Sequence, residues 1–295
     1  MIYSFRELSK EQRKKLYCFI KEFGFNFYFN TYEEMLSNYS GVLFDNGKSY
    51  FTLWDKEEIK GTIGVISKDI KENGEIFFAS INIYENNQKY FEKLLKYSIE
   101  YAKKYNPNKI KLGLKPNSKH IMSTVKKIGF REVYKAVILR LECSEKLNSI
   151  EIHNSINFEN LSDKNKDVYK VINNESFRNS PNCGVMTDKE IKELLKKRNE
   201  KSLIVGIIYS NEEPVGIYEL HIQEGIGWVD TIGILPKFQG NKFGKILLKK
   251  SINILKQFEV EDIKLIVISS NNIGYSLYKK YGFVDDEILS YWFEK

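Results

Sequence analysis

Apolar, β-branched runs bounded by turn residues alternate with longer amphipathic segments along the whole chain. In the second half, such runs predict strands near Phe158 and at Leu203–Tyr209, Val215–Ile222, Trp228–Leu235 and Ile263–Ile268, with a last strand ending at Trp292–Phe293. The amphipathic segments predict helices near Asp163–Glu175, behind the expected N-cap Thr187, and at Phe243–Phe258 and Asn272–Tyr281. Helices inserted between strands predict an α/β fold, an α+β sandwich with a mixed central sheet flanked by helices.

The first half shows the same order of elements. Helices are predicted at Lys10–Phe23, Gln88–Tyr105 and Ser118–Ile128. Strands are predicted near Tyr50–Trp54 and at Gly61–Ile66, Glu75–Ile83, Lys109–Leu114 and Ala136–Leu141. The similarity in order indicates two copies of one fold.

An internal repeat supports this division. An offset of 153 positions, which places residue 81 opposite 234 and residue 130 opposite 283, matches Leu94-Leu95-Lys96 with Leu247-Leu248-Lys249 and Gly129-Phe130 with Gly282-Phe283. The polar stretch Cys143–Ser149 lacks periodicity and is the expected linker. We therefore expect tandem domains at residues 1–142 and 149–295.

Composition narrows the functional classes. With 29% charged and 42% hydrophobic residues in 295, the chain lies in the ordinary globular range, which excludes disorder and coiled coil as descriptions of the whole. The net charge of +7 comes from dispersed lysines without an arginine-rich arm, so nucleic acid is not an expected partner. The longest apolar run is too short to span a bilayer and the amino terminus has no signal-peptide pattern, so we expect no membrane association and a cytoplasmic location.

The chain contains three cysteines, Cys18, Cys143 and Cys183, and three histidines, His120, His153 and His221. The widely spaced cysteines do not predict a disulfide framework. The histidines show no ligand spacing with cysteines or carboxylates, so no metal is expected.

The clearest chemical signal lies between residues 228 and 248. A strand ended by Pro236 leads into the loop Gln239–Gly244, which opens a helix. Backbone N–H groups and the positive end of the helix dipole converge at such a point, and glycine lets the backbone curl around an anion. Lys237, Lys242 and Lys245 add positive charge, so this loop is expected to bind phosphate.

A second motif follows the loop, with Asn271, Leu277, Tyr278, Gly282 and Phe283 at fixed spacing. Together the two motifs resemble the GNAT superfamily of acyl-CoA-dependent N-acyltransferases. In that family the loop reads Gln/Arg-x-x-Gly-x-Gly/Ala and the later helix reads Asn-x-x-Ala-x-x-Leu-Tyr-x-x-x-Gly-Phe. The chain departs from the family at two positions, where Gly274 stands for alanine and Lys242 for a loop glycine.

The resemblance implies roles for individual residues around acyl-CoA. It implies that the backbone of Ile232, Gly233 and Ile234 pairs with the pantetheine arm, to which Asn271 also donates a hydrogen bond. It implies that the pyrophosphate is held by the loop residues Gln239, Gly240, Asn241, Lys242, Phe243 and Gly244 and by Lys245. Tyr278 is expected near the thioester sulfur as the general acid, because a phenol stays protonated at neutral pH.

The base that deprotonates the incoming amine has three candidates. Asp230 lies two residues before Ile232, which predicts that both side chains share one face of the strand that leads to the loop. Glu219 and His221 on the neighbouring strand are the alternatives. Asp230 is the first choice.

The first half lacks these groups. The offset places Gln239–Gly244 opposite residues 86–91, which contain no glycine, Tyr278 opposite Val125, and Asn271 opposite Ser118. The first domain is therefore expected to keep the fold, to bind acyl-CoA poorly or not at all, and to form part of the acceptor site or a platform.

The sequence thus predicts an acyl-CoA-dependent N-acyltransferase that transfers acetyl from acetyl-CoA to a primary amine by direct attack. The expected acceptor is a small-molecule or peptide amine, and the loop Arg178–Met186 is expected to shape its site. A non-catalytic acyl-CoA sensor or a scaffold module is the alternative, and an acyltransferase for a macromolecular amine is a further one. The oligomeric state is not predicted.

Overall fold

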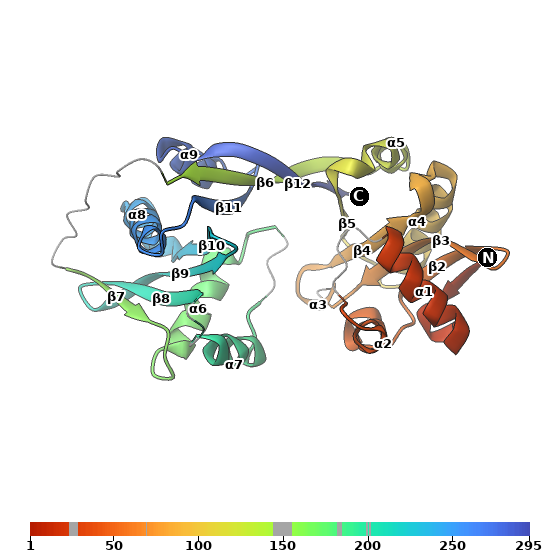
Figure 1. Cartoon of the computed structure of the whole chain (residues 1–295), viewed down its shortest axis with the longest axis horizontal. Helices are drawn as coiled ribbons and strands as arrows, with labels where there is room; N and C mark the ends of the chain where they lie inside the picture. Colours follow the sequence, from red (N-terminus) through yellow and green to blue (C-terminus); the bar gives the residue numbers. More distant parts are fainter. Residues whose placement is uncertain (24–28, 69, 144–154, 182–184, 199, 201) are drawn as a thin grey trace. The chain divides into compact units, whose positions relative to one another are not determined.

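The structure is a computed structural model that describes residues 1–23, 29–68, 70–143, 155–181, 185–198, 200 and 202–295. The chain divides into two compact units (Figure 1). Unit 1 comprises Met1–Ala136 and Ile288–Lys295, and unit 2 comprises Val137–Glu287. Each unit is an α/β sandwich, as the sequence predicts.

Unit 1 contains the first five strands, the start of the sixth and the first five helices of the described chain. The strands are β1 (Ile2–Ser4), β2 (Tyr50–Asp55), β3 (Glu58–Ile66), β4 (Glu75–Ile83), β5 (Lys109–Leu114) and β6 (Arg131–Glu142). The helices are α1 (Lys10–Phe23), α2 (Tyr32–Tyr39), α3 (Ile70–Asn73), α4 (Gln88–Lys103) and α5 (Lys119–Lys127). Short 3₁₀ turns occur at η1 (Phe5–Glu7), η2 (Val42–Phe44), η3 (Tyr84–Asn86) and η4 (Pro116–Ser118).

Two apolar layers cover the sheet of unit 1. Its strand order is β1-β2-β3-β4-β5, followed by the carboxyl half of the last strand of the chain, β12 (Val284–Glu294), and then β6. One buried cluster joins α4 and α5 to one face, and a second, rich in aromatic rings, joins α1 and α2 to the other. Strand β4 is parallel to β5, whereas β2 and β3 are antiparallel to their neighbours.

Unit 2 repeats the order with its own strands and helices. The strands are β7 (Ile156–Asn160), β8 (Leu203–Ser210), β9 (Glu213–Gln223), β10 (Ile226–Ile234) and β11 (Asp262–Ile268). The helices are α6 (Lys166–Phe177), α7 (Asp188–Lys197), α8 (Phe243–Lys256) and α9 (Asn272–Lys280), with the 3₁₀ turn η5 (Pro236–Phe238) before α8.

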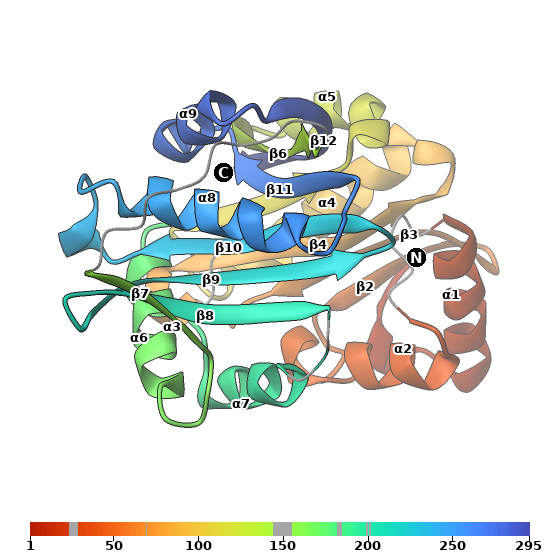
Figure 2. The ribbon, with the colours of Figure 1, turned by 60° about the vertical axis from the view of Figure 1, so that its left-hand side comes forward.

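The sheet of unit 2 also lies between two apolar layers. From the amino half of β12 its order is β12-β6-β11-β10-β9-β8-β7, with β10 and β11 parallel. Helices α8 and α9 pack on one face, and α6 and α7 pack on the other. Figure 2 shows α8 running along the face of β9 and β10. Helix α7 starts at a capping box in which Thr187 and Glu190 satisfy each other's backbone N–H groups, as the sequence predicts for the cap.

The compact units differ from the expected boundaries at residues 142 and 149. Strand β6 begins in unit 1 and ends in unit 2, and β12 begins in unit 2 and ends in unit 1. The carboxyl end of β12 is antiparallel to β5, with Trp292 opposite Gly113. Periodicity identifies both strands but not their partners, because any apolar strand edge can supply the same backbone hydrogen bonds. Apart from Cys143, the expected linker lies outside the described residues.

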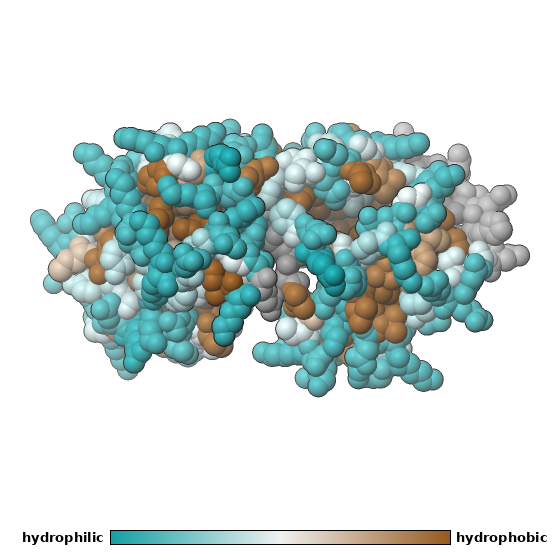
Figure 3. Space-filling view, turned by 180° about the vertical axis from the view of Figure 1, so that it is seen from behind, coloured by the Kyte–Doolittle hydropathy of each residue, from teal (hydrophilic) through white to brown (hydrophobic). Residues whose placement is uncertain are grey.

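Polar side chains dominate the face of the molecule seen in Figure 3, with smaller apolar areas between them. This agrees with a lysine excess that is spread over the chain. Within the described ranges, no helix combines the length and the apolar character that crossing a bilayer requires.

Candidate functional site

Strand β10 separates from β11 halfway along its length. The parallel pairing runs from Ile226 opposite Asp262 to Val229 opposite Leu265 and stops there. A β-bulge between Val229 and Thr231 shifts the register against β9 at the same point. Residues 231–234 stay paired with β9, and in the described structure their other edge has no partner strand. An extended ligand backbone can bind such an edge as an added strand.

The bulge changes the direction of one candidate side chain. Ile232 packs with the apolar cluster of α8, whereas Asp230 contacts His221 on the opposite face. The prediction that Asp230 and Ile232 share a face is therefore wrong. An inserted bulge residue breaks the alternation on which that prediction relied.

The start of α8 is open. Among the described side chains, none caps this helix, and the backbone N–H groups of residues 240–245 have no described acceptor. A helix ordinarily satisfies its first N–H groups through a side-chain cap, water or a ligand. Because the helix dipole places partial positive charge at the same point, the open N–H groups form a site for an anion.

Lys242 adopts a backbone conformation that favours glycine. Its φ is +67°, in the left-handed region, and Gly240 has φ +82°. A side chain in this region costs about 1 kcal/mol or more, so the loop keeps this backbone conformation despite the lysine. Lys242 and Lys245 have no acidic partner in the described chain, whereas Lys237 is paired with Glu213.

Two loop side chains shape the backbone. Gln239 donates from Nε2 to the carbonyl of Ile234 at 3.1 Å, which ties the loop to the end of β10. Asn271 accepts the N–H of Gly274 at 3.0 Å and caps α9, which leaves its amide N–H groups available to a ligand. A Cβ at position 274 would lie 2.7 Å from the Asn271 side chain, which explains glycine at the position that is alanine in the family motif.

The loop, the open strand edge and the second motif converge. A Cβ at Gly244 would lie 3.9 Å from Ile234 and 3.9 Å from Leu277, the residue before Tyr278. Tyr278 packs edge-on against Phe283 with ring centroids 6.0 Å apart. Burial raises the pKa of the Tyr278 phenol to about 12, so the phenol keeps its proton at neutral pH.

The three candidate bases also lie together. The carboxylate of Asp230 contacts Nδ1 of His221, and Glu219 lies opposite Thr231, directly after the bulge. Burial raises the pKa of Glu219, and the negative charge of Asp230 raises it further, while His221 opposes this shift. The shift makes the ionised Glu219 carboxylate more basic than an exposed one, which is the direction that suits a general base.

Sequence reasoning missed one member of this cluster, Tyr169 of α6. Its side chain is fully buried, and its hydroxyl has no hydrogen-bond partner in the described structure. Burial raises its pKa well above the ordinary value, and the charges of Glu219 and Asp230 add to the shift. Tyr169 belongs to neither motif, so only the packing of α6 on β9 and β10 reveals it.

Helix α6 also approaches β10 closely. A Cβ at Gly233 would lie 3.0 Å from the Phe177 ring and 3.2 Å from Ser176. The packing of α6 on β10 therefore requires glycine at position 233. The same residue lies on the open edge of the strand. Three residues of the loop expected to shape the acceptor site, 182–184, lie outside the described residues.

Unit 1 has no equivalent anion site in the described structure. Helix α4 begins at Gln88, and Asn87 caps it by accepting the N–H groups of Lys89 and Tyr90 at 3.0 and 3.3 Å. In unit 1, one residue separates the 3₁₀ turn η3 from α4. In unit 2, residues 239–242 separate η5 from α8. The gapless offset therefore fails at this loop, because α4 extends over positions that form the loop in unit 2.

The described residues include no group of three or more His, Cys, Asp or Glu arranged to hold a metal ion. Cys18 and Cys143 are free thiols, and Cys183 lies outside the described residues. Burial raises the pKa of the Cys143 thiol. Neither described cysteine is part of the arrangement around the α8 loop.

Comparison with known proteins identifies the family of unit 2. Residues 167–283 match the family model described as "Acetyltransferase (GNAT) family". No curated protein matches the sequence.

Solved structures match the whole chain. A GCN5-related N-acetyltransferase from Sphaerobacter thermophilus is 12% identical with a TM-score of 0.66, over 100% of this chain and 95% of the other. A tandem GNAT protein from the clavulanic acid biosynthesis pathway is 8% identical with a TM-score of 0.63, over 100% and 98%. A GCN5-related N-acetyltransferase from Anabaena variabilis is 11% identical with a TM-score of 0.64, over 100% and 72%.

At these identities the solved structures establish the fold, and the family match establishes the relationship of the second unit. The match covers α6 to Phe283 and so includes the open loop, the bulged strand and the second motif. The chain has the tandem GNAT fold, and its residues 167–283 belong to the GNAT acetyltransferase family.

Proposed function

We propose that unit 2 transfers an acetyl group from acetyl-CoA to a primary amine by direct attack. The observation that carries this proposal is the open start of α8 beside the unpaired edge of β10. The first feature suits the pyrophosphate of CoA and the second suits its amide-containing pantetheine arm. The two features lie in contact through Gly244 and Ile234, as one extended ligand requires.

Acetyl-CoA binds with its pyrophosphate at the N–H groups of residues 240–245. Lys242 and Lys245 supply positive charge, and Gln239 keeps the loop tied to Ile234. The pantetheine arm pairs with the backbone of residues 232–234, and the free amide of Asn271 donates a hydrogen bond to it. This geometry brings the thioester towards the bulge and α9.

The amine nitrogen attacks the thioester carbonyl carbon, and the carbon–sulfur bond breaks. The products are an acetamide and CoA. Tyr278 donates a hydrogen bond, and finally a proton, to the sulfur that leaves, because its phenol, with a pKa of about 12, is protonated at neutral pH. Holding the two reactants together supplies much of the acceleration.

Glu219 is the group that takes a proton from the ammonium form of the acceptor, directly or through water. Its raised pKa makes it a stronger base than an exposed carboxylate. The assignment of the base thus moves from Asp230 to Glu219. Asp230, in contact with His221, orients the cluster and attracts the cationic acceptor. The acceptor is a small-molecule or peptide amine, and the reaction takes place in the cytoplasm.

The test is release of free CoA from acetyl-CoA in the presence of a panel of primary amines, with mass spectrometry of the acceptor. The proposal predicts release that depends on the amine and an added acetyl group on the product. Binding of CoA without release for any amine would favour the acyl-CoA sensor. Absence of CoA binding would favour the scaffold module.

A further inference from the structure

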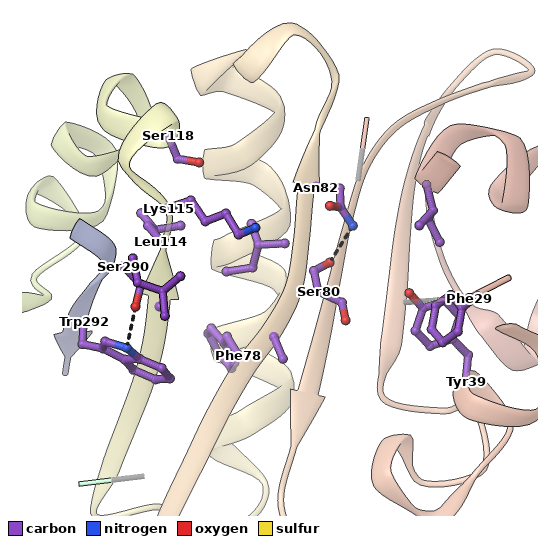
Figure 4. A pocket seen from close by; sticks show the side chains of 15 residues that line it. Phe29, Tyr39, Phe78, Ser80, Asn82, Leu114, Lys115, Ser118, Ser290 and Trp292 are labelled. Atoms are coloured by element: carbon purple, nitrogen blue, oxygen red, sulfur yellow. Dashed lines mark hydrogen bonds between the residues drawn. The ribbon is translucent and has the colours of Figure 1, made fainter. Parts of the chain in front are cut away.

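Unit 1 contains a cavity of about 410 Å³ where β4 and β5 separate (Figure 4). The two strands are paired from Glu75 opposite Lys109 to Phe78 opposite Leu112. Beyond that point, residues 79–82 of β4 and 113–115 at the end of β5 line the cavity instead. A volume of this size lies in the range of small-molecule sites, about 300–1,000 Å³.

The walls of the cavity are largely apolar and aromatic. Phe78, Leu114 and Trp292 contribute to one side and Phe29 and Tyr39 to another (Figure 4). Gly113 makes room for the indole of Trp292, because a Cβ there would lie 3.1 Å from that ring. Such walls suit a ligand with an apolar or aromatic body.

Two polar side chains with an unused hydrogen-bonding atom line this cavity. Asn82, 7% exposed, donates from Nδ2 to Thr62 at 3.0 Å and to the carbonyl of Ser80 at 3.2 Å, but its amide oxygen has no described partner. Ser118, 6% exposed, has a hydroxyl that likewise has none in the described structure. A ligand group in the cavity can therefore form hydrogen bonds to both atoms.

The backbone around Ser80 is strained at the same place. Ser80 has φ +51° at a bulge in the pairing of β3 with β4. Thr62 donates to its carbonyl at 2.9 Å and holds the conformation. Strain of this kind persists where the surrounding structure enforces it, commonly at ligand sites.

The charge of the lining indicates the sign of the ligand. Lys115 reaches from the end of β5 towards β4 (Figure 4), and the described residues that line the cavity include no acidic side chain. The Asn87 cap on α4 removes the N–H groups that a pyrophosphate would need. The cavity therefore suits a small anion and not the whole of CoA.

We infer that the unit 1 cavity binds a small carboxylate with an apolar or aromatic body and one hydrogen-bond donor. The carboxylate lies at Lys115 and the Ser118 hydroxyl, the donor at the amide oxygen of Asn82, and the apolar body against the aromatic walls. This site belongs to unit 1 alone and does not depend on the activity of unit 2.

Titration calorimetry of the full-length protein tests this with three probes, 3-phenyllactate, 3-phenylpropanoate and 3-phenylpropylamine. The first has all three features, the second lacks the hydroxyl donor, and the third carries the opposite charge. We expect affinity to fall about tenfold at each step, which is about 1.4 kcal/mol per step. Equal binding of the amine and the acids, or no binding of 3-phenyllactate at millimolar concentration, would overturn the inference.

Variants locate the site. Lys115→Met is expected to weaken 3-phenyllactate about tenfold, whereas Lys119→Met, an exposed lysine on α5, leaves it unchanged. Trp292→Phe is expected to remove the change in tryptophan fluorescence on binding, since the ring lines the cavity. Saturating acetyl-CoA is expected not to displace the probe. Displacement by acetyl-CoA, or equal effects of the two lysine variants, would contradict the assignment.

Discussion

His221 on β9 contacts the carboxylate of Asp230 at the bulge of β10. This pair holds Asp230 on the face of the sheet that α6 covers, away from the α8 face to which Ile232 belongs. Glu219 lies on the same side and has its pKa raised by burial and by Asp230. The bulge thus positions carboxylates on one face while the strand edge stays open.

Glu219→Gln is expected to lower turnover at neutral pH by about 10²-fold, the effect of a lost general base. The deficit should shrink as the pH rises, because the acceptor amine then loses its proton to solvent. Glu213→Gln, which changes an exposed carboxylate on the same strand, should leave the pH profile unchanged. Profiles of kcat against pH distinguish these outcomes, and a deficit independent of pH would contradict the role of base.

The same substitution has a predicted effect on stability. Because the pKa of Glu219 is raised above its ordinary value of 4.5, the folded state favours the protonated form. The carboxyl therefore contributes stability below pH 4.5 that is lost as the pH rises through its folded pKa. Glu219→Gln should raise Tm relative to the parent at about pH 7 and give no difference at about pH 4. A Tm difference of the same size at both values would contradict the shift.

Tyr278→Phe is expected to lower kcat by about 10²-fold with little change in acetyl-CoA affinity, because the phenol donates to sulfur as the bond breaks. Tyr275→Phe is the matched control on the same helix, since its hydroxyl bonds Asp285 outside the loop. Stopped-flow measurement of CoA release compares the two. Equal turnover for Tyr278→Phe and the parent would remove Tyr278 as the acid.

Lys242→Gly is expected to be more stable than Lys242→Ala by about 1 kcal/mol, since glycine adopts the observed φ of +67° without strain. Both substitutions remove one positive charge, so both should weaken acetyl-CoA binding by about two- to fivefold. This loss of affinity should be smaller at high salt, because salt screens the interaction between charges. Urea unfolding and calorimetry measure the two quantities. Equal stability of the variants would show that the side chain carries no backbone strain.

Apolar periodicity predicted most of the fold. It located α1, β4 and β5 at the bounds that the structure shows, because long amphipathic helices and buried strands have strong periods. It missed α2, a helix of eight residues whose start is marked by the Thr31 cap. It also placed the start of β6 at Ala136, five residues late, because the strand begins among polar residues.

Only part of the candidate site could be predicted from the sequence. The loop and Tyr278 belong to local motifs, so sequence spacing alone identifies them as candidates, and their roles stay predictions. The open edge of β10, the direction of Asp230 and the burial of Glu219 depend on a bulge, and no residue type specifies a bulge reliably. Tyr169 and the unit 1 cavity arise from packing between elements far apart in sequence, which periodicity does not report.

We expect each chain to bind one acetyl-CoA at the open start of α8. Gly244 tests it directly, because the site has room for a side chain: a Cβ at this position would have its nearest neighbours 3.9 Å away. Gly244→Ala is expected to keep binding. Gly244→Asp places a carboxylate in the first turn of α8. The helix dipole stabilises this negative charge, but the charge repels a pyrophosphate.

Titration calorimetry of acetyl-CoA against the full-length protein and these two variants is therefore the deciding measurement. We expect one site per chain and an affinity for Gly244→Asp at least about 100-fold below that of Gly244→Ala, a difference of about 2.7 kcal/mol. The Tm of Gly244→Asp is not expected to fall. Two sites per chain, or equal affinity of the two variants, would contradict this expectation.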